Sequence, residues 1–258
     1  MSGRTHPPAR HPPARTARVS EIFGPTFQGE GSTVGERAIF IRFGLCNLDC
    51  GVGGAPMACD TAYTWDTTQY DLDVDLTTMT DLEIWEKVQS IDPSTENPAL
   101  PCVGLIVVTG GEPLIHKASL IWLGDVCRAG GRRMEIETNA TIAPGRALVQ
   151  TKVKFNAGLK LANCGVPRKK RIKPAAIREI QGSGRAMWKF VVTDLADLKE
   201  IAALEAEFGL TNIWVSPEGT DAPTLLDGLR TFADPVLARG WNLTTRQHIL
   251  IWGKRRGT

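Results

Sequence analysis

Short apolar segments alternate with helical patterns along almost the whole chain, and this alternation restricts the possible folds more than any other feature. The apolar segments predict strands at residues 38–43, 103–109, 134–138, 151–155, 187–193 and 212–216. Helical patterns lie between several of them, at residues 81–91, from the turn at 110–113 to about 129, at 195–208 and at 222–238. Strands separated by helices form parallel βαβ units, whose functional groups gather at the carboxyl ends of the strands. About six or seven such units are fewer than the eight of a closed barrel, so we expect an α/β fold with an incomplete, open parallel β/α barrel of about six units.

The composition is that of a folded protein. The chain has 258 residues, of which 42% are hydrophobic, and a formal net charge of +2. This apolar content suffices for one large domain and excludes disorder throughout the chain, which requires low hydrophobicity and high net charge. No stretch approaches the roughly 20 uninterrupted apolar residues of a membrane helix, so we expect no membrane span.

The N-terminal segment differs from the rest of the chain. Residues 6–10 and 11–15 repeat the sequence His-Pro-Pro-Ala-Arg, and residues 1–19 hold four arginines and no acidic residue. The prolines prevent the amphipathic helix of a transit peptide, and the apolar stretch of a secretory signal is missing. We therefore predict a disordered Pro/Arg-rich tail over residues 1–19 and one domain over residues 20–258. Without the four arginines the net charge falls from +2 to −2, so we expect the domain to bind no nucleic acid.

A second basic segment lies inside the domain, where Arg168-Lys-Lys-Arg171 is followed by Lys173. Such runs are typical of solvated loops. Contact with an anionic substrate or with a nucleic acid is the alternative interpretation. The sequence alone assigns this run no role.

Three of the six cysteines, Cys46, Cys50 and Cys59, lie close together in the sequence. Six cysteines are too few for a disulfide-stabilised scaffold in a chain of this length. A zinc site would need four ligands, and only two histidines lie outside the tail. Three thiolates on one loop suit an iron–sulfur cluster with one iron left open, which can chelate an amine and a carboxylate. Three buried, chemically inert cysteines are the alternative, but the Gly-rich segment 51–56 is typical of a loop.

Such a cluster is oxygen-sensitive, so we expect the protein in a reducing compartment, the cytoplasm. Cys102, Cys127 and Cys164 have no partner at a recognisable spacing, and we interpret them as structural.

Several motifs resemble those of known enzymes. Cys46-Asn-Leu-Asp-Cys50, Cys59-Asp-Thr-Ala-Tyr-Thr-Trp65 and Gly110-Gly-Glu-Pro113 resemble the radical S-adenosylmethionine enzymes. The resemblance narrows to the 7-carboxy-7-deazaguanine synthase family, over about residues 20–253, through Phe27-Gln-Gly-Glu-Gly31, Phe40-Ile-Arg42, Glu137-Thr-Asn139, Lys160-Leu-Ala-Asn163 and Gln247-His-Ile-Leu-Ile-Trp252. One departure stands out. Eight residues separate Cys50 from Cys59 where the family commonly has two, and Ala58 replaces the usual aromatic residue before the third cysteine.

The resemblance implies a set of site residues. Cys46, Cys50 and Cys59 would bind a 4Fe–4S cluster, and Thr61 would ligate Mg²⁺. The residues expected to contact S-adenosylmethionine are Ala58, Asp60, Gly110, Gly111, Glu112, Gly158 and Lys160. The residues expected to contact the substrate, 6-carboxy-5,6,7,8-tetrahydropterin, are Phe27, Gln28, Gly29, Glu30, Arg42 and Thr109.

The resemblance also implies a reaction and its partners. Reductive cleavage of S-adenosylmethionine would start a radical ring contraction that yields 7-carboxy-7-deazaguanine and ammonia, a lyase reaction in the formation of queuosine-type precursors. An electron donor such as flavodoxin or ferredoxin would supply the electron, and a homodimer is expected. Two alternatives remain at this point: an activase that places a glycyl radical on a partner protein, and a non-catalytic zinc-binding interaction protein.

Overall fold

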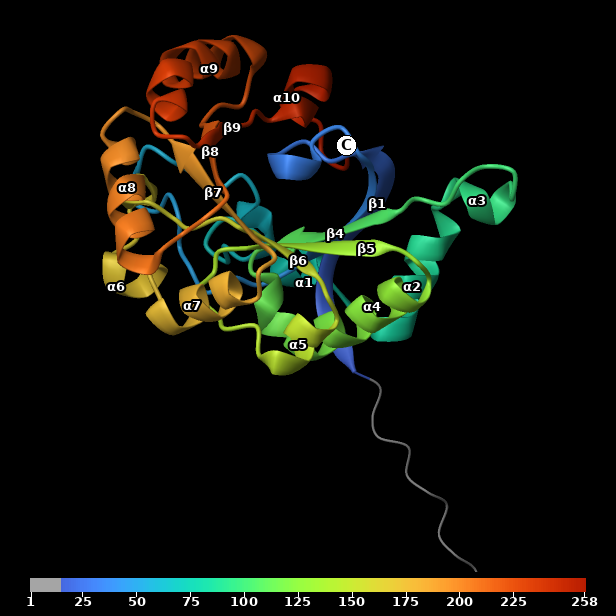
Figure 1. The fold of residues 1–258 in the computed structure, drawn as a ribbon. Helices are drawn as coiled ribbons and strands as arrows, with labels where there is room; N and C mark the ends of the chain where they lie inside the picture. The colour runs from blue at the N-terminus through green and yellow to red at the C-terminus, as the bar shows by residue number, and fades with distance from the viewer. Residues whose placement is uncertain (1–14) are drawn as a thin grey trace, which may run out of the picture.

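The computed structural model describes residues 15–258, in which nine strands form one sheet in the order β3-β1-β2-β4-β5-β6-β7-β8-β9 (Figure 1). The parallel strands are β2 (Arg37–Phe43), β4 (Leu105–Gly110), β5 (Arg133–Thr138), β6 (Lys154–Ala157), β7 (Ala186–Val192), β8 (Ile213–Pro217) and β9 (Asn242–Leu243). The strand β1 (Thr16–Phe27) pairs antiparallel with β2 and with β3 (Thr77–Thr80). Since β3 and β9 form the two edges of the sheet, the barrel stays open, which confirms the predicted fold class.

Helices connect most of the parallel strands. The longer ones are α2 (Asp81–Ser90), α4 (Lys117–Ala129), α7 (Pro174–Gly182), α8 (Asp197–Phe208) and α9 (Ala222–Leu237). The shorter ones are α1 (Leu72–Asp75), α3 (Pro93–Glu96), α5 (Arg146–Gln150), α6 (Arg168–Arg171) and α10 (Gln247–Trp252). Short 3-10 turns lie at Gly31–Thr33, Ala62–Thr64, Pro113–His116 and Ala162–Cys164. None of the helices between residues 15 and 258 has the length and apolarity needed to cross a membrane.

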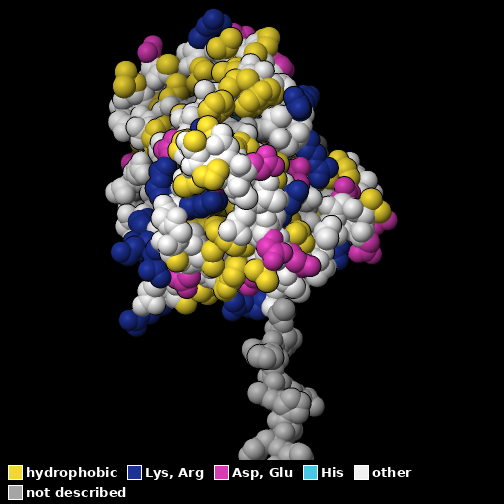
Figure 2. Space-filling view, turned by 90° about the vertical axis from the view of Figure 1, so that its right-hand side faces the viewer, with side chains coloured by type: hydrophobic (Ala, Val, Ile, Leu, Met, Phe, Trp, Pro, Cys, Tyr) yellow, Lys and Arg dark blue, Asp and Glu magenta, His cyan; other side chains and the backbone are white. Residues whose placement is uncertain are grey.

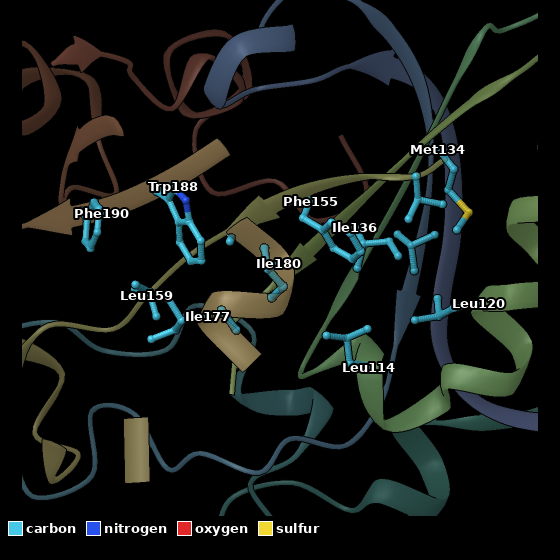
Figure 3. Packing of buried hydrophobic residues seen from close by; sticks show 14 of the residues in the cluster. Leu114, Leu120, Met134, Ile136, Phe155, Leu159, Ile177, Ile180, Trp188 and Phe190 are labelled. Atoms are coloured by element: carbon cyan, nitrogen blue, oxygen red, sulfur yellow. The ribbon is translucent and has the colours of Figure 1, made fainter. Parts of the chain in front are cut away.

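The main hydrophobic core lies between the helices and one face of the sheet. Figure 3 shows Ile177 and Ile180 of α7 close to Phe155 of β6 and Trp188 of β7. Side chains of a strand point alternately to opposite faces, so the residues between these core positions point to the inner face of the barrel. The inner face is where the polar strand residues of the site lie.

The folded part of the chain begins earlier than the sequence indicated. Residues 16–19, which the composition predicts as part of the tail, belong to β1, where Ala17 and Val19 are buried. Their alternation with Arg18 and Ser20 is a strand pattern that the arginine-rich composition obscures. The remainder of the predicted tail, residues 1–14, lies outside the described residues.

Two predicted element ends also differ. Thr80, and not Asp81, caps α2, because its hydroxyl accepts a hydrogen bond from the Glu83 amide (3.2 Å) while the Glu83 carboxylate accepts one from the Thr80 amide (2.7 Å). The strand expected at residues 151–155 begins only at Lys154, because Lys152 has a positive φ of 67° in the turn that ends α5.

Candidate active site

A cavity of about 570 Å³ lies on the inner face of the sheet, and residues near the carboxyl ends of the parallel strands line it. Strand alternation brings five polar residues to its wall: Arg42, Thr109, Glu137, Asn156 and Lys189. Every residue that the sequence predicts for the cluster, for S-adenosylmethionine, for Mg²⁺ or for the substrate lines this cavity, except Glu112. Residues far apart in the sequence therefore meet at one site, and their individual roles stay predictions.

Cys46, Cys50 and Cys59 are free thiols on the cavity wall. Burial raises the pKa of the Cys46 thiol to about 11, and contact with Cys164 together with burial raises that of Cys50. No three His, Cys, Asp or Glu side chains within residues 15–258 are grouped to hold a single metal ion. A 4Fe–4S cluster imposes a different requirement, because each thiolate binds its own iron, and iron would deprotonate these thiols. Three free thiols around one cavity fit such a cluster.

The eight residues between Cys50 and Cys59 form an outward loop that returns to the cavity. Val52 is 61% exposed at its tip, whereas Met57 is buried and lines the cavity beside Ala58. The amides of Gly51 and Met57 donate to the carbonyl oxygens of Cys164 (3.0 Å) and Asn163 (3.1 Å). These two hydrogen bonds fix both ends of the loop to the segment that follows β6.

Gly110 and Gly111 allow a close approach of two backbones. A Cβ atom on either residue would collide with a carbonyl oxygen, that of Phe43 or of Leu45, and Gly110 has a φ of +137°. The amide of Gly111 donates to Phe43 (3.1 Å). These glycines therefore bring the end of β4 against the loop that begins at Cys46.

Glu112 lies behind the cavity wall and is completely buried. Its carboxylate accepts hydrogen bonds from the Leu114 amide (3.0 Å), the Thr138 hydroxyl (2.7 Å) and the Asn139 amide (2.7 Å). Burial raises the pKa of Glu112 although these hydrogen bonds favour its charged form. Glu112 therefore holds Thr138 and Asn139, which do line the cavity.

A hydrogen-bonded group of polar side chains lies on the predicted substrate side. The Glu137 carboxylate accepts from the Thr109 hydroxyl (2.8 Å) and from the Gln28 amide (3.2 Å). Desolvation raises the pKa of Glu137. Glu137 was not among the predicted site residues, although its place in a family motif and near the end of a strand was a usable signal.

The carboxylate of Glu21 holds the guanidinium of Arg42 in place. Its Nε donates to the Glu21 carboxylate (2.7 Å), which also accepts from the Tyr63 hydroxyl (3.2 Å). Arg42 belongs to β2, which lies between β1 and β4 in the sheet, and its side chain is mostly buried. Since no partner takes its terminal nitrogens among the described residues, they are available to an anion in the cavity.

The motif around Cys59 surrounds that thiol with polar groups. The Trp65 indole nitrogen lies 3.3 Å from the Cys59 sulfur as a donor, and the Thr61 hydroxyl lies 3.6 Å from it and 3.5 Å from the Gly110 carbonyl oxygen. Lys160 lines the cavity nearby. Burial lowers the pKa of Lys160, but Cys50, Cys59 and other anionic groups outweigh burial and raise it. A cationic group beside the three thiols favours their ionised form.

A network of ion pairs that the sequence did not predict crosses the cavity. The Glu30 carboxylate is paired with Lys189 and with Nε of Arg246 (3.1 Å), and Arg246 also pairs with Asp60. The His248 ring packs against Gly29, and burial together with Arg246 lowers its pKa to about 4, so the ring is neutral at pH 7. Lys189 belongs to none of the motifs identified in the sequence.

The chain matches no family model, but it is similar to several curated proteins along most of its length. It is 32% identical to the 7-carboxy-7-deazaguanine synthase of Pyrobaculum aerophilum, over 93% of this chain and 96% of that protein. It is 29% identical to that of Hyperthermus butylicus (91% and 92%) and 27% identical to that of Escherichia coli (89% and 96%). The crystal structure of QueE from Escherichia coli shares the fold, with a TM-score of 0.65 at 23% identity over 90% of this chain and 95% of that one. The cavity that gathers three free cysteines agrees with this similarity. Full-length similarity of this extent shows that the chain belongs to the 7-carboxy-7-deazaguanine synthase family.

Proposed function

We propose that the chain converts 6-carboxy-5,6,7,8-tetrahydropterin to 7-carboxy-7-deazaguanine with loss of ammonia. One observation carries the proposal: a single cavity combines three free cysteines with a separate group of hydrogen-bonded polar side chains. Family membership supports this radical S-adenosylmethionine reaction over the activase and the zinc-binding protein considered from the sequence.

Cys46, Cys50 and Cys59 would hold the 4Fe–4S cluster, and the groups around Gly110, Gly158 and Lys160 would receive S-adenosylmethionine beside it. When bound, this pair supplies one-electron cleavage of the sulfonium and a radical that removes a hydrogen atom from the substrate. The chain itself provides an apolar wall that limits access of water to the reacting groups, made of Leu48, Met57, Leu159, Leu161 and Val191.

The polar group on the other side would bind the pterin. Gln28 and Glu137 offer a donor and an acceptor to the edge of the ring, and Thr109 orients Glu137. The terminal nitrogens of Arg42 would bind the substrate carboxylate through two parallel hydrogen bonds, because Glu21 fixes the plane of the guanidinium from the opposite side. Phe27, stacked on Trp252 at 6.3 Å, would cover the ring.

Mg²⁺ would bind at Thr61, whose hydroxyl faces the cavity. A hydroxyl oxygen suits this hard cation, and waters and substrate oxygens would complete the coordination, as Mg²⁺ commonly prefers. Further expectations concern the whole protein: an external donor such as flavodoxin or ferredoxin, a homodimer, and a reducing compartment such as the cytoplasm.

The direct test is an anaerobic assay. Protein with a reconstituted cluster, a chemical reductant, S-adenosylmethionine, Mg²⁺ and the carboxypterin should form 7-carboxy-7-deazaguanine, identified by chromatography and mass spectrometry. The same sample should contain iron and sulfide, and a Cys59→Ala variant should lose both together with activity. A fully loaded wild-type protein that forms no deazaguanine product would refute the proposed function.

A further inference from the structure

The basic run that the sequence left without a role lies next to the cysteine loop. Cys164 contacts Cys50 within a small hydrophobic cluster, and α6 begins four residues further along the chain at Arg168. The same segment binds the inserted loop through the hydrogen bond from Gly51 to Cys164 (3.0 Å), and Lys170 lies 3.7 Å from Asp49. The exposed residues next to Cys50 in the sequence and the helix α6 therefore lie beside each other at the surface.

One arginine of the run is structural and fixes α6 to the cavity wall. Arg171 is buried, and its guanidinium donates to the carbonyl oxygens of Lys160 (2.7 Å) and Val166 (3.1 Å) and pairs with Glu200 (2.7 Å). Lys160 lines the cavity beside the three cysteines. Because Arg171 ties α6 to Lys160, the exposed side chains of α6 are held at a fixed place relative to the cluster site.

The other four basic residues of the run are exposed: Arg168, Lys169, Lys170 and Lys173. Arg168 pairs with Glu207 of α8 and Lys170 with Asp49. In the part of the chain that the structure describes, Lys169 and Lys173 make no ion pair. An exposed patch with uncompensated positive charge remains over the segment that packs on Cys50.

We propose that this patch, formed by Arg168, Lys169, Lys170 and Lys173, docks a small acidic one-electron carrier protein of the flavodoxin type. The inference rests on the proposed function in one respect: that reaction needs an electron from outside the chain. Electron transfer slows steeply with distance, so a donor must dock where the cluster site is near the surface. Positive charge there attracts an acidic partner and orients it, and complexes of redox proteins need only small interfaces.

The proposed step is the transfer of a single electron. One electron leaves the reduced flavin of the carrier and enters the cluster, and no bond between the two proteins forms or breaks. The patch contributes orientation and association rate, while the exposed Gly-rich loop beside it leaves the approach open: Val52 is 61% exposed, and a Cβ atom on Gly53 or Gly54 would meet nothing within 4 Å.

The test compares two double variants with equal charge changes. Lys169→Glu/Lys173→Glu alters the patch, and Lys87→Glu/Arg128→Glu alters exposed positions on α2 and α4, which lie on the opposite side of the molecule from α6 in Figure 1. Figure 2 shows the face on the side of α2 and α3, where acidic and basic side chains are interspersed, so this control removes no single-sign patch.

Binding of an acidic flavodoxin is measured by calorimetry without substrate, and cluster reduction is followed by electron paramagnetic resonance. At an ionic strength of about 10 mM, where the Debye length is about 30 Å, the patch variant should bind flavodoxin at least about tenfold more weakly than the control. At about 1 M salt the difference should vanish. Reduction of the cluster by dithionite should be unchanged, whereas reduction by flavodoxin should slow in parallel with binding.

Three results would overturn the proposal. Equal flavodoxin affinity of the two variants at low salt would show that the patch is not the docking surface. A patch variant whose cluster is reduced by flavodoxin as fast as that of the control would show that the electron does not enter through the patch. Displacement of flavodoxin from the wild type by equimolar transfer RNA would identify the patch as a nucleic-acid surface. Since neither readout requires substrate turnover, a failure of the proposed function would leave this test intact.

Discussion

Replacement of Glu112 by Gln tests whether Glu112 supports the wall of the cavity or binds a ligand itself. One carboxylate oxygen of Glu112 accepts from the Leu114 amide and the Thr138 hydroxyl, and the other accepts from the Asn139 amide. A glutamine that keeps the first two hydrogen bonds must turn its NH₂ group toward the Asn139 N–H. The site is completely buried, so no water restores the missing acceptor.

The magnitude follows from this geometry. A buried donor left without a partner costs about 1–3 kcal/mol, and the two remaining hydrogen bonds lose their charge assistance, so we expect a destabilisation of about 3 kcal/mol. In a domain of this size each kcal/mol lowers the melting temperature by about 2–4 °C. Glu112→Gln should therefore melt about 6–12 °C below the wild type in thermal unfolding followed by circular dichroism.

Glu218→Gln is the matched control. Glu218 lines the same cavity, and its side chain makes no hydrogen bond or ion pair with the rest of the described chain, so the melting temperature should stay close to that of the wild type. The reasoning fails if Glu112→Gln melts like this control but binds S-adenosylmethionine at least about tenfold more weakly, because Glu112 would then act on the cosubstrate itself.

Three further predictions concern the cavity. Trp65→Phe removes the donor that lies 3.3 Å from the Cys59 sulfur, so the reduction potential of the cluster should become more negative in a redox titration; an unchanged potential would exclude this hydrogen bond. Burial lowers the pKa of His248 from 6.5 to about 4, so the unfolded chain takes up a proton before the folded protein does as the pH falls. The free energy of unfolding should therefore be highest above pH 6.5 and should fall by up to about 3 kcal/mol toward pH 4, measured by urea unfolding. His248→Gln should lack this fall, and identical pH profiles of the two proteins would contradict the prediction. Arg42→Ala should still cleave S-adenosylmethionine but form no deazaguanine, and loss of both activities would mean that Arg42, with Glu21, supports the cavity instead.

Much of the fold could be read from local patterns. Short apolar segments at β2, β4 and β5 indicated the strands, and the alternation of side chains along a strand sends Arg42, Thr109 and Glu137 to the inner face. Element ends were less predictable, because capping depends on a few side-chain hydrogen bonds, as at Thr80. The strands β1 and β3 were both missed, since their pairing with each other stabilises both.

The sequence by itself determined the class of fold, the cysteine spacing, the glycines at the end of β4 and the family motifs, because each of these is encoded within a few consecutive residues. Only the tertiary structure decided which distant side chains meet. Glu30 reaches Lys189 across 159 positions and Arg246 across 216, and Cys164 reaches Cys50 through the packing of two loops. Glu112 lies behind the cavity wall for the same reason. Such contacts depend on strand order and loop packing, which no local pattern records.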